Sequence, residues 1–137
     1  MVYYITDNTG LCTSQLTGFF VRWPNPPSPE THLRILQQSD YVVLAVDDET
    51  HRVVGFVTAI SDKILSAYIP LLEVLPEYQY RGIGRELMER MLIQLDGLYM
   101  IDLTCDPKLQ KAYRQLGFQK MTAMMIRRFD CQSGRKA

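Results

Sequence analysis

Apolar residues recur along this chain at two spacings, and each spacing predicts a different kind of element. Short apolar runs rich in β-branched residues at 41–46 and 52–60 flank the polar segment DDETH, a pattern typical of a two-stranded hairpin. A third run, at residues 67–75, also predicts a strand. Pro70 lies inside it and has no backbone N–H, so we expect a bulge or lost pairing at that point.

Helical spacing appears in other segments. Residues 84–95 carry apolar side chains every three or four positions, and Gly97 provides a typical end for that helix. Ser28 followed by Pro29 is typical of an N-cap and first helical position, which predicts a second helix reaching Gln38. A weak apolar face predicts a further helix at residues 10–20, and the cap signal Asp106–Pro107 predicts another at residues 107–116, which stops at Gly117.

Three more strands are expected, at residues 2–6, 98–104 and 121–129. Hairpin-linked strands at the start and a crossover helix later predict an α/β fold with a mixed sheet. We place a single domain at residues 1–130 and expect residues 131–137 to form a polar, frayed C-terminal tail.

Composition excludes some classes of function but does not identify one. The chain has 137 residues, 47% of them hydrophobic, which suffices for one sizeable core. Fifteen basic and fifteen acidic side chains balance, so charge favours neither a nucleic-acid nor a membrane partner. Cys12, Cys105 and Cys131 lack metal-ligand spacing, so we expect reduced thiols and no metal. Without a signal peptide or a long apolar run, a cytoplasmic location is expected.

The segment EYQYRGIGREL, residues 77–87, places Gly82 and Gly84 where a helix should begin. Glycine inside a helix costs roughly 0.5–1 kcal/mol relative to alanine, so these two belong to the turn and first helical positions. The first turn of a helix has unpaired N–H groups and the positive end of the dipole. An anion such as a phosphate could approach the amides of residues 81–85 there, with Arg81 and Arg85 adding charge.

Two familiar phosphate-binding motifs are absent, and a turn that holds nothing remains an alternative. A dinucleotide-binding site needs G-x-G-x-x-G early in a parallel unit, and a P-loop needs G-K-[ST]. The chain has only G-x-G, preceded by hairpin strands. The glycines could also simply soften a strand-to-helix turn.

Two motifs in the second half of the chain resemble those of the GNAT superfamily of acyl-CoA N-acyltransferases. The segment LLEVLPEYQYRGIGRELMERML resembles its pyrophosphate-binding segment, an apolar strand followed by [QR]-x-x-G-x-[GA]. The matching residues are Leu72, Val74, Pro76, Gln79, Gly82 and Gly84. Downstream, AYRQLGF resembles the family's Y-x-x-x-G-F through Tyr113, Gly117 and Phe118. The resemblance implies a mostly antiparallel central sheet with helices on both faces and a splayed parallel strand pair that holds CoA.

The resemblance also implies acetyl-CoA as cosubstrate and a set of residues that bind it. The pyrophosphate would contact backbone amides of residues 81–85, with Gln79 and Tyr80 at the edge. Backbone groups near Leu72 and Val74 would hold the pantetheine amide and the acetyl carbonyl. The implied cofactor-binding residues are Leu72, Val74, Gln79, Tyr80, Arg81, Gly82, Ile83, Gly84 and Arg85.

The implied reaction is transfer of an acetyl group to a primary amine by direct attack through a tetrahedral intermediate. Tyr113 matches the family's tyrosine beside the thioester sulfur. A phenol of pKa about 10 stays protonated at neutral pH and can donate to a thiolate of pKa about 8.5. The alternative is an amphipathic core tyrosine with its hydroxyl at the surface.

Glu73 is the candidate general base, because it lies on the strand beside the presumed acetyl site. It could instead be an outward-facing strand residue, with water accepting the proton. The acceptor, a small-molecule or peptide amine, should enter over the proline-rich loop at residues 23–30, which could equally be a rigid connector. His32 and Asp102 are weaker candidates for chemistry.

Two further readings stay open, together with the question of self-association. The chain could be a CoA-binding sensor or regulatory module without turnover, or a structural domain whose glycines serve packing only. The edge strand expected at residues 121–129 could pair with a second copy and form a homodimer, an idea that rests partly on the resemblance.

Overall fold

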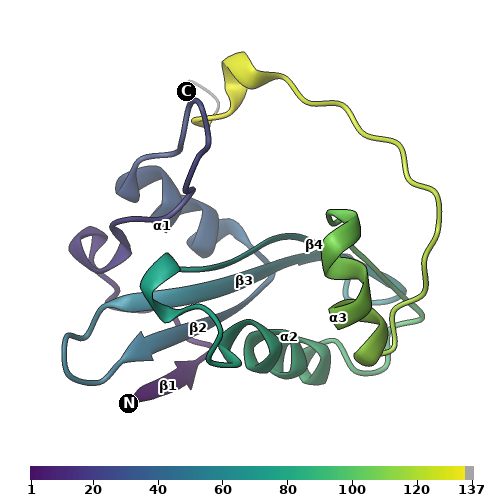
Figure 1. The fold of residues 1–137 in the computed structure, drawn as a ribbon, viewed down its shortest axis with the longest axis horizontal. Coiled ribbons are helices and arrows are strands. Elements are labelled where there is room, and N and C mark those ends of the chain that lie inside the picture. The colour runs from purple at the N-terminus through teal and green to yellow at the C-terminus, as the bar shows by residue number, and fades with distance from the viewer. Residues whose placement is uncertain (135–137) are drawn as a thin grey trace.

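Five strands form one mixed sheet in the computed structural model, which describes residues 1–134, in the order β1-β2-β3-β4-β5 (Figure 1). The strands are β1 (Val2–Ile5), β2 (Tyr41–Asp47), β3 (Val53–Ser61), β4 (Ser66–Val74) and β5 (Met100–Asp102). Neighbouring strands are antiparallel except for the parallel pair β4 and β5. The expected α/β fold with a mostly antiparallel sheet is therefore confirmed.

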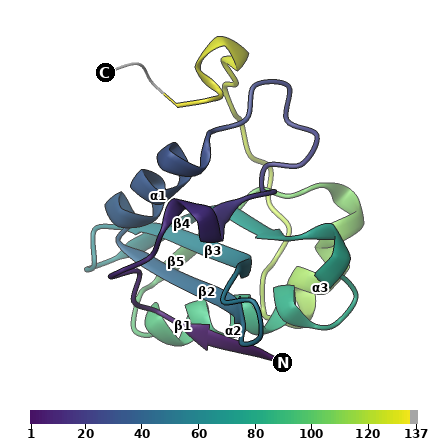
Figure 2. The same cartoon turned by 90° about the vertical axis from the view of Figure 1, so that its left-hand side faces the viewer.

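Helices cover both faces of this sheet, as expected (Figure 2). The α-helices are α1 (Pro29–Gln38), α2 (Ile83–Gln94) and α3 (Gln110–Gln115). Single-turn 3-10 helices are η1 (Thr13–Leu16), η2 (Pro76–Tyr78), η3 (Pro107–Leu109) and η4 (Phe129–Cys131). α2 packs on β2 and β3 and buries Leu87, Met88 and Met91 fully. Removing this apolar surface from water is the main favourable term that holds α2 on the sheet.

The ends of α1 and α2 follow the sequence signals. The Ser28 side chain accepts a hydrogen bond from the Thr31 amide at 3.1 Å, and Pro29 occupies the first turn of α1. Gly97 follows α2 in the left-handed region, with φ +92°. Both signals depend on local backbone chemistry, which explains why they could be identified without the fold.

Pro70 produces a bulge that separates β4 from β5. Ile69 and Pro70 of β4 together lie opposite the single residue Ala59 of β3, where the register shifts. A bulge bends the strand that carries the extra residue. β4 accordingly pairs with β5 only over Ser66–Tyr68, against Met100–Asp102. Among the described residues, no other strand pairs with the rest of β4 on that side, which confirms the predicted splayed parallel pair.

The prediction of a helix at residues 10–20 is wrong, because only η1 forms there. Gly10, Gly18 and Phe20 all have positive φ, between +61° and +93°, which a right-handed helix does not allow. The carbonyl of Thr17 accepts a hydrogen bond from the Arg52 guanidinium at 2.9 Å. The apolar residues of this segment are therefore buried by a folded loop.

The predicted strand at residues 121–129 is also wrong. Residues 119–127, the C-terminal arm, make no backbone hydrogen bond to any part of residues 1–134. In Figure 1 the arm runs in a wide arc from α3 to the loop ahead of α1. It lacks a strand partner, so no ladder forms. The strand expected at residues 98–104 is shorter than predicted, since β5 pairs only where β4 lies beside it.

Two other predicted elements differ in detail. The helix expected at residues 107–116 consists of η3 followed directly by α3. The expected tail begins in η4. Residues 131–134 lie near the loop ahead of α1, where the backbone amide of Asn25 donates a hydrogen bond to the Gln132 side chain at 2.8 Å. Residues 135–137 of that predicted tail lie outside the described residues. In the described part of the chain, no helix combines the length and apolarity needed to cross a bilayer.

Candidate functional site

The start of α2 exposes a run of main-chain donors. Gly82 is the N-cap, with φ +80°, and no side chain caps the helix. The first helical hydrogen bond joins the Glu86 amide to the Gly82 carbonyl at 3.1 Å. Within residues 1–134, the amides of residues 80–85 have no acceptor, and we call them the amide cradle. Free donors at the positive end of a helix dipole form a site suited to an anion.

Packing gives no reason for the two glycines of the cradle. A Cβ atom placed on Gly82 would meet nothing within 4 Å, and one on Gly84 would only touch a Val74 methyl group at 3.7 Å. Gly82 is required by its positive φ, whereas Gly84 leaves open space above the amides. Tyr80 also has a positive φ of +64°, a conformation that costs a non-glycine residue about 1–3 kcal/mol. The backbone is thus held in an unusual shape where the donors converge.

The splayed edge of β4 adds further free main-chain groups. The Leu75 amide donates to the Val54 carbonyl at 2.8 Å, so this is a hydrogen-bonded pair of the antiparallel ladder. Such pairs alternate, so Glu73 also pairs with β3, while Leu72 and Val74 direct their N–H and C=O groups to the side that β5 leaves empty. Gln79 donates from its side chain to the Val74 carbonyl at 3.0 Å. Within residues 1–134, the Val74 N–H and both main-chain groups of Leu72 have no hydrogen-bond partner.

The two arginines of the motif are occupied by protein partners. Arg81 donates to the Glu77 carbonyl at 3.1 Å and lies over the Tyr78 ring. Arg85 forms an ion pair with Glu89 at 2.8 Å. That carboxylate balances the charge of Arg85, whereas both of these partners of Arg81 are neutral and leave its charge at the cradle uncompensated.

Glu73 lies in a hollow of about 560 Å³ beside the cradle, whose lining also includes Gln79 and Tyr80. Its carboxylate accepts hydrogen bonds from the amides of Phe20 at 2.9 Å and Val21 at 3.3 Å. The side chain is half-buried. Burial raises the pKa of Glu73, and the two amide hydrogen bonds oppose that rise. We call this space the Glu73 hollow.

The loop over the Glu73 hollow is strained and aromatic. Phe20 and Arg22 have φ of +61° and +68°, and the hydrogen bonds that the Phe20 and Val21 amides donate to Glu73 hold this part of the loop in place. Strain of this kind concentrates at functional sites. Trp23 packs against Phe20 with ring centroids 4.9 Å apart and ring planes inclined by 59°, and Trp23 and Phe56 both line the hollow.

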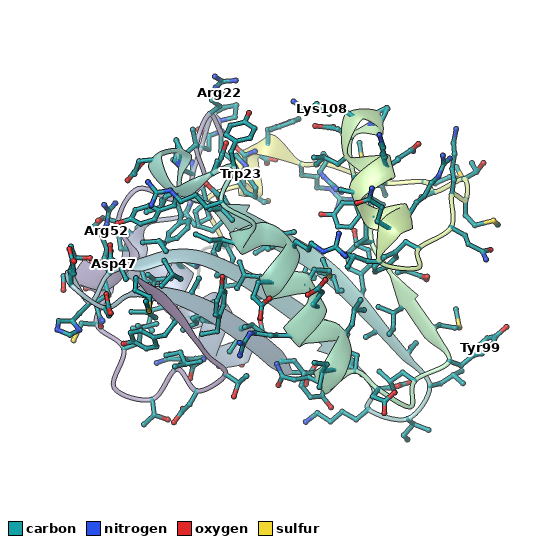
Figure 3. The ribbon with its side chains drawn as sticks, turned by 60° about the horizontal axis from the view of Figure 1, so that its bottom comes forward. Arg22, Trp23, Asp47, Arg52, Tyr99 and Lys108 are labelled. Carbon is teal, nitrogen blue, oxygen red and sulfur yellow. The ribbon has the colours of Figure 1, made fainter. Side chains whose placement is uncertain are left out.

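Two cationic side chains at this hollow were not predicted from the sequence. Arg22 comes from the strained loop, and Lys108 comes from η3; both line the hollow and are labelled in Figure 3. No sequence spacing links either residue to the glycine motif, because the two segments meet only in the fold. The proline-rich loop at residues 23–30 predicted that the acceptor enters on this side, but it did not indicate which side chains would line the hollow.

His32 lies outside this hollow. Its side chain is only 1% exposed and contacts the rings of Phe19, Phe20 and Phe56. Burial lowers the pKa of His32 to about 4, so the ring is neutral at pH 7. Both ring nitrogens lack a partner within the described chain. His32 is therefore enclosed by aromatic rings and has no place at the proposed acceptor position.

Tyr113 lies in a second hollow, of about 330 Å³, with Leu103, Thr104 and Cys105. It is half-buried on α3, and its ring meets Phe118 edge-on at 5.8 Å. Burial raises the pKa of Tyr113, so the phenol keeps its proton at neutral pH. We call this space the Tyr113 hollow.

The structure does not bring Tyr113 and Glu73 into one cavity, because their hollows share no lining residue. The Glu73 hollow is lined by β4, whereas the Tyr113 hollow is lined by the residues that continue β5. The splay between the two strands separates them. Within residues 1–134, no cluster of His, Cys, Asp and Glu side chains is placed to bind a metal ion.

Comparisons with known proteins agree with this geometry. The family described as an acetyltransferase (GNAT) domain matches residues 19–128. The chain is 31% identical over 112 residues to GCN5-related N-acetyltransferase 1, chloroplastic, of Arabidopsis thaliana, covering 80% of this chain and 57% of that protein. It is 34% identical over 117 residues to serotonin N-acetyltransferase 2, chloroplastic, of Oryza sativa subsp. japonica, covering 82% and 58%. The chain thus spans just over half the length of these curated relatives.

A solved structure extends the likeness to nearly the whole chain. The crystal structure of a candidate acetyltransferase from Deinococcus radiodurans R1 is 46% identical and superposes with a TM-score of 0.95. The match covers 99% of this chain and 94% of that one.

Proposed function

Because the chain belongs to the GNAT family of acetyltransferases, we propose that it transfers an acetyl group from acetyl-CoA to a primary amine. One observation supports this most directly: the amide cradle lies next to the free main-chain groups of Leu72 and Val74. A diphosphate needs clustered donors, and an amide-containing chain needs a strand edge with both donors and acceptors. The strand edge at Leu72 and Val74 is followed by the donor cluster at the start of α2, as the amide-containing chain of CoA is followed by its diphosphate.

The proposed binding mode uses the backbone almost throughout. The amides of residues 81–85 would bind the diphosphate, with Gln79 and Tyr80 at its edge. Leu72 would pair with a pantetheine amide in the manner of an added strand. The Val74 N–H would donate to the thioester oxygen and support the negative charge that develops on it. Gln79 occupies the Val74 carbonyl, which leaves the N–H as the free group at this position.

Two proton transfers are assigned to side chains. The neutral amine attacks the thioester carbon, a C–N bond forms, and the C–S bond breaks. Glu73 would accept the proton from the amine nitrogen, directly or through water, because its raised pKa lies closer to neutrality than that of an exposed glutamate. Tyr113 would donate its proton to the departing sulfur from the opposite wall of the splay.

For the acceptor we propose a primary amine that carries an aromatic group. Trp23 and Tyr80 provide exposed aromatic surface at the Glu73 hollow, and the single carboxylate there suits a single amine. Arg22 and Lys108 at the same hollow disfavour polycationic acceptors such as polyamines. The name of the rice relative, a serotonin N-acetyltransferase, agrees with this choice.

Calorimetric titration with CoA and acetyl-CoA tests the first half of the proposal. We expect binding to the purified chain, and no binding at millimolar ligand would overturn the proposed function. Release of free thiol from acetyl-CoA is then measured with an arylalkylamine, spermidine and a lysine-containing peptide. We expect the arylalkylamine to react fastest. Binding without thiol release from any amine would favour the alternative, a CoA-binding module without turnover.

A further inference from the structure

We propose that the amine acceptor also carries an anionic group, a carboxylate or a phosphate, which Arg22 and Lys108 bind while Glu73 receives the amine. The inference deepens the proposed function and rests on it, because it concerns the acceptor that the Glu73 hollow would hold. It adds a negative charge to the aromatic primary amine proposed above.

The Glu73 hollow has an excess of positive charge. Its charged lining residues are Glu73, Arg22 and Lys108, so two positive charges face one negative charge. The chain as a whole has fifteen basic and fifteen acidic side chains, so this excess is a local feature. An acceptor with only an ammonium group would be attracted by the carboxylate and repelled by both cations. An acceptor that carries an amine and an anion complements all three charges.

Neither cation is neutralised by the described part of the protein. Within residues 1–134, ion pairs include three other arginines and one lysine, but none includes Arg22 or Lys108. Both side chains are exposed, so a ligand can reach them from solvent. A guanidinium group binds a carboxylate or phosphate through two parallel hydrogen bonds, and an ammonium adds a point charge on a flexible stem. The two side chains are therefore available to an anionic ligand.

The backbone at Arg22 is linked to the proposed amine site. Its φ of +68° lies in the left-handed region, which residues with a side chain rarely adopt. The Glu73 carboxylate holds the two preceding residues, since it accepts hydrogen bonds from the amides of Phe20 at 2.9 Å and Val21 at 3.3 Å. The residue that would receive the amine thus also holds the backbone that leads into Arg22.

Lys108 reaches the same hollow from a different element. It lies in η3, which follows β5, whereas Glu73 lies on β4 and Arg22 lies on the loop ahead of α1 (Figure 3). Two cations that reach one hollow from separate elements can contact an anion from two sides. An acceptor held in this way would be oriented as well as attracted.

Aromatic surface lies next to the proposed anion site. Trp23 follows Arg22 in the same loop, is 37% exposed and packs against the buried ring of Phe20. Within the hollow of about 560 Å³, an acceptor can place its ring against Trp23, its anion at Arg22 and its amine at Glu73. Aromatic amino acids and aromatic amines that carry a phosphate have these three groups.

Two other roles for the cations predict different results. Gln79 and Tyr80, at the edge of the amide cradle, line the same hollow, so the cations could instead bind the phosphates of CoA. In that case their removal would weaken CoA binding. Nearby positive charge also favours the neutral form of an amine, and this effect would act on every acceptor alike. Only an anion-binding role discriminates between acceptors with and without a negative group.

Steady-state kinetics with three arylalkylamines test the proposal. Phenethylamine has no anion, phenylalanine adds a carboxylate, and O-phosphotyramine adds a phosphate. We expect kcat/KM for at least one anionic acceptor to exceed that for phenethylamine about tenfold, the effect of one charge-assisted contact. The preferred compound identifies the anion, and the preference should shrink as salt is added. If phenethylamine reacts as well as both anionic acceptors, the inference is wrong and the proposed function stands; no turnover of any of the three would overturn both.

Arg22→Gln and Lys108→Gln remove the two charges one at a time. Each should reduce the preference for the anionic acceptor to about threefold or less, because one charge-assisted contact is lost. The value for phenethylamine should not fall, since a repelling charge has been removed. Comparing two acceptors in the same variant cancels differences in the basicity of their amines. Arg34→Gln and Lys111→Gln are matched controls, exposed on α1 and α3 and outside the hollow, and should keep the full preference.

Calorimetric titration of the same variants with CoA completes the test. We expect CoA affinities within about twofold of the unmodified value, as for a surface substitution away from the site. Weaker CoA binding that accounts for the lost activity would assign the cations to the cosubstrate. An equal loss of rate for all three acceptors would assign them to the protonation of the amine. Either result, or a preference that survives both substitutions, would overturn the proposal.

Discussion

Two regions of this molecule leave main-chain groups without partners, and they do so in different ways. At the amide cradle, consecutive donors lie at the positive end of α2, and the space above Gly82 and Gly84 is open. At β5 and the C-terminal arm, donors and acceptors alternate along extended backbone, with apolar side chains between them. The first region has only donors to offer, whereas the second has both kinds of group.

The difference identifies the kind of partner each region requires. Converging donors are satisfied by a compact anion, which brings acceptors and no donors. Alternating donors and acceptors are satisfied by another strand, and the apolar side chains add a reason to exclude water. The amide cradle therefore has the requirements that the proposed small cosubstrate meets, whereas β5 and the C-terminal arm have the requirements of an extended strand.

The largest effect is expected from Tyr113→Phe. Removing the proton donor should lower kcat by roughly 10²–10⁴-fold, while the affinity for CoA changes little, because the amide cradle is untouched. Steady-state kinetics and calorimetry on the same preparation separate these two quantities. Tyr3→Phe, on β1 at the far edge of the sheet, is the control and should behave like the unmodified enzyme. Equal rates for Tyr113→Phe would show that the sulfur departs without help from the phenol.

A smaller loss of rate, roughly 10²-fold, is expected for Glu73→Gln, since water can take over part of the base's role. The glutamine retains an oxygen that accepts from Phe20, so the strained loop should hold its shape. Burial raises the pKa of Glu73, so the unmodified enzyme should lose activity as pH falls through a value above that of an exposed glutamate.

The pH–rate profile decides the role of Glu73. The limb on the acidic side should move in Glu73→Gln and persist in Glu77→Gln, a nearby exposed carboxylate. If the limb is the same in all three proteins, water or bulk solvent takes the proton. That outcome would leave Glu73 as a residue that only holds the loop through Phe20 and Val21.

Features encoded by local backbone chemistry could be predicted from the sequence. The glycines at the start of α2, the cap at Ser28 and the bulge at Pro70 each depend on what one or two residues can do with their own backbone. The amide cradle belongs to this class, as does the splay, because Pro70 causes it. These features include most of the proposed CoA-binding surface.

Features that depend on distant partners could not be predicted in this way. The segment at residues 121–129 has the composition of a strand, yet its sequence does not state whether its partner lies in the same chain. Glu73 reaches the amide of Phe20 across 53 positions of sequence, and no spacing rule connects them. The positions of Lys108 and Arg22 at the hollow could not be predicted for the same reason. The acceptor side was therefore less predictable than the cofactor side.

Gly82→Ala should weaken CoA binding by about tenfold, which corresponds to one charge-assisted hydrogen bond of the cradle. Gly97→Ala is a matched control, since Gly97 lies at the other end of α2 with a similar φ and equally open space around it. Both changes force alanine into the left-handed region and should cost about 1–2 kcal/mol of stability. Thermal unfolding should show equal losses, and calorimetry should show weaker binding only for Gly82→Ala. Equal affinities would mean that the cradle does not hold the anion.

The smallest effect is expected where the two regions are tested against each other. Ile126→Asp should leave the affinity for CoA within about twofold of the unmodified value, since a surface substitution away from a site changes free energies by about 0.5 kcal/mol or less. The C-terminal arm contributes no residue to the amide cradle or to the Glu73 hollow. Calorimetry on the variant measures the affinity directly. A loss of tenfold or more would mean that the arm helps to shape the cradle, and the two unpaired regions would then belong to one site.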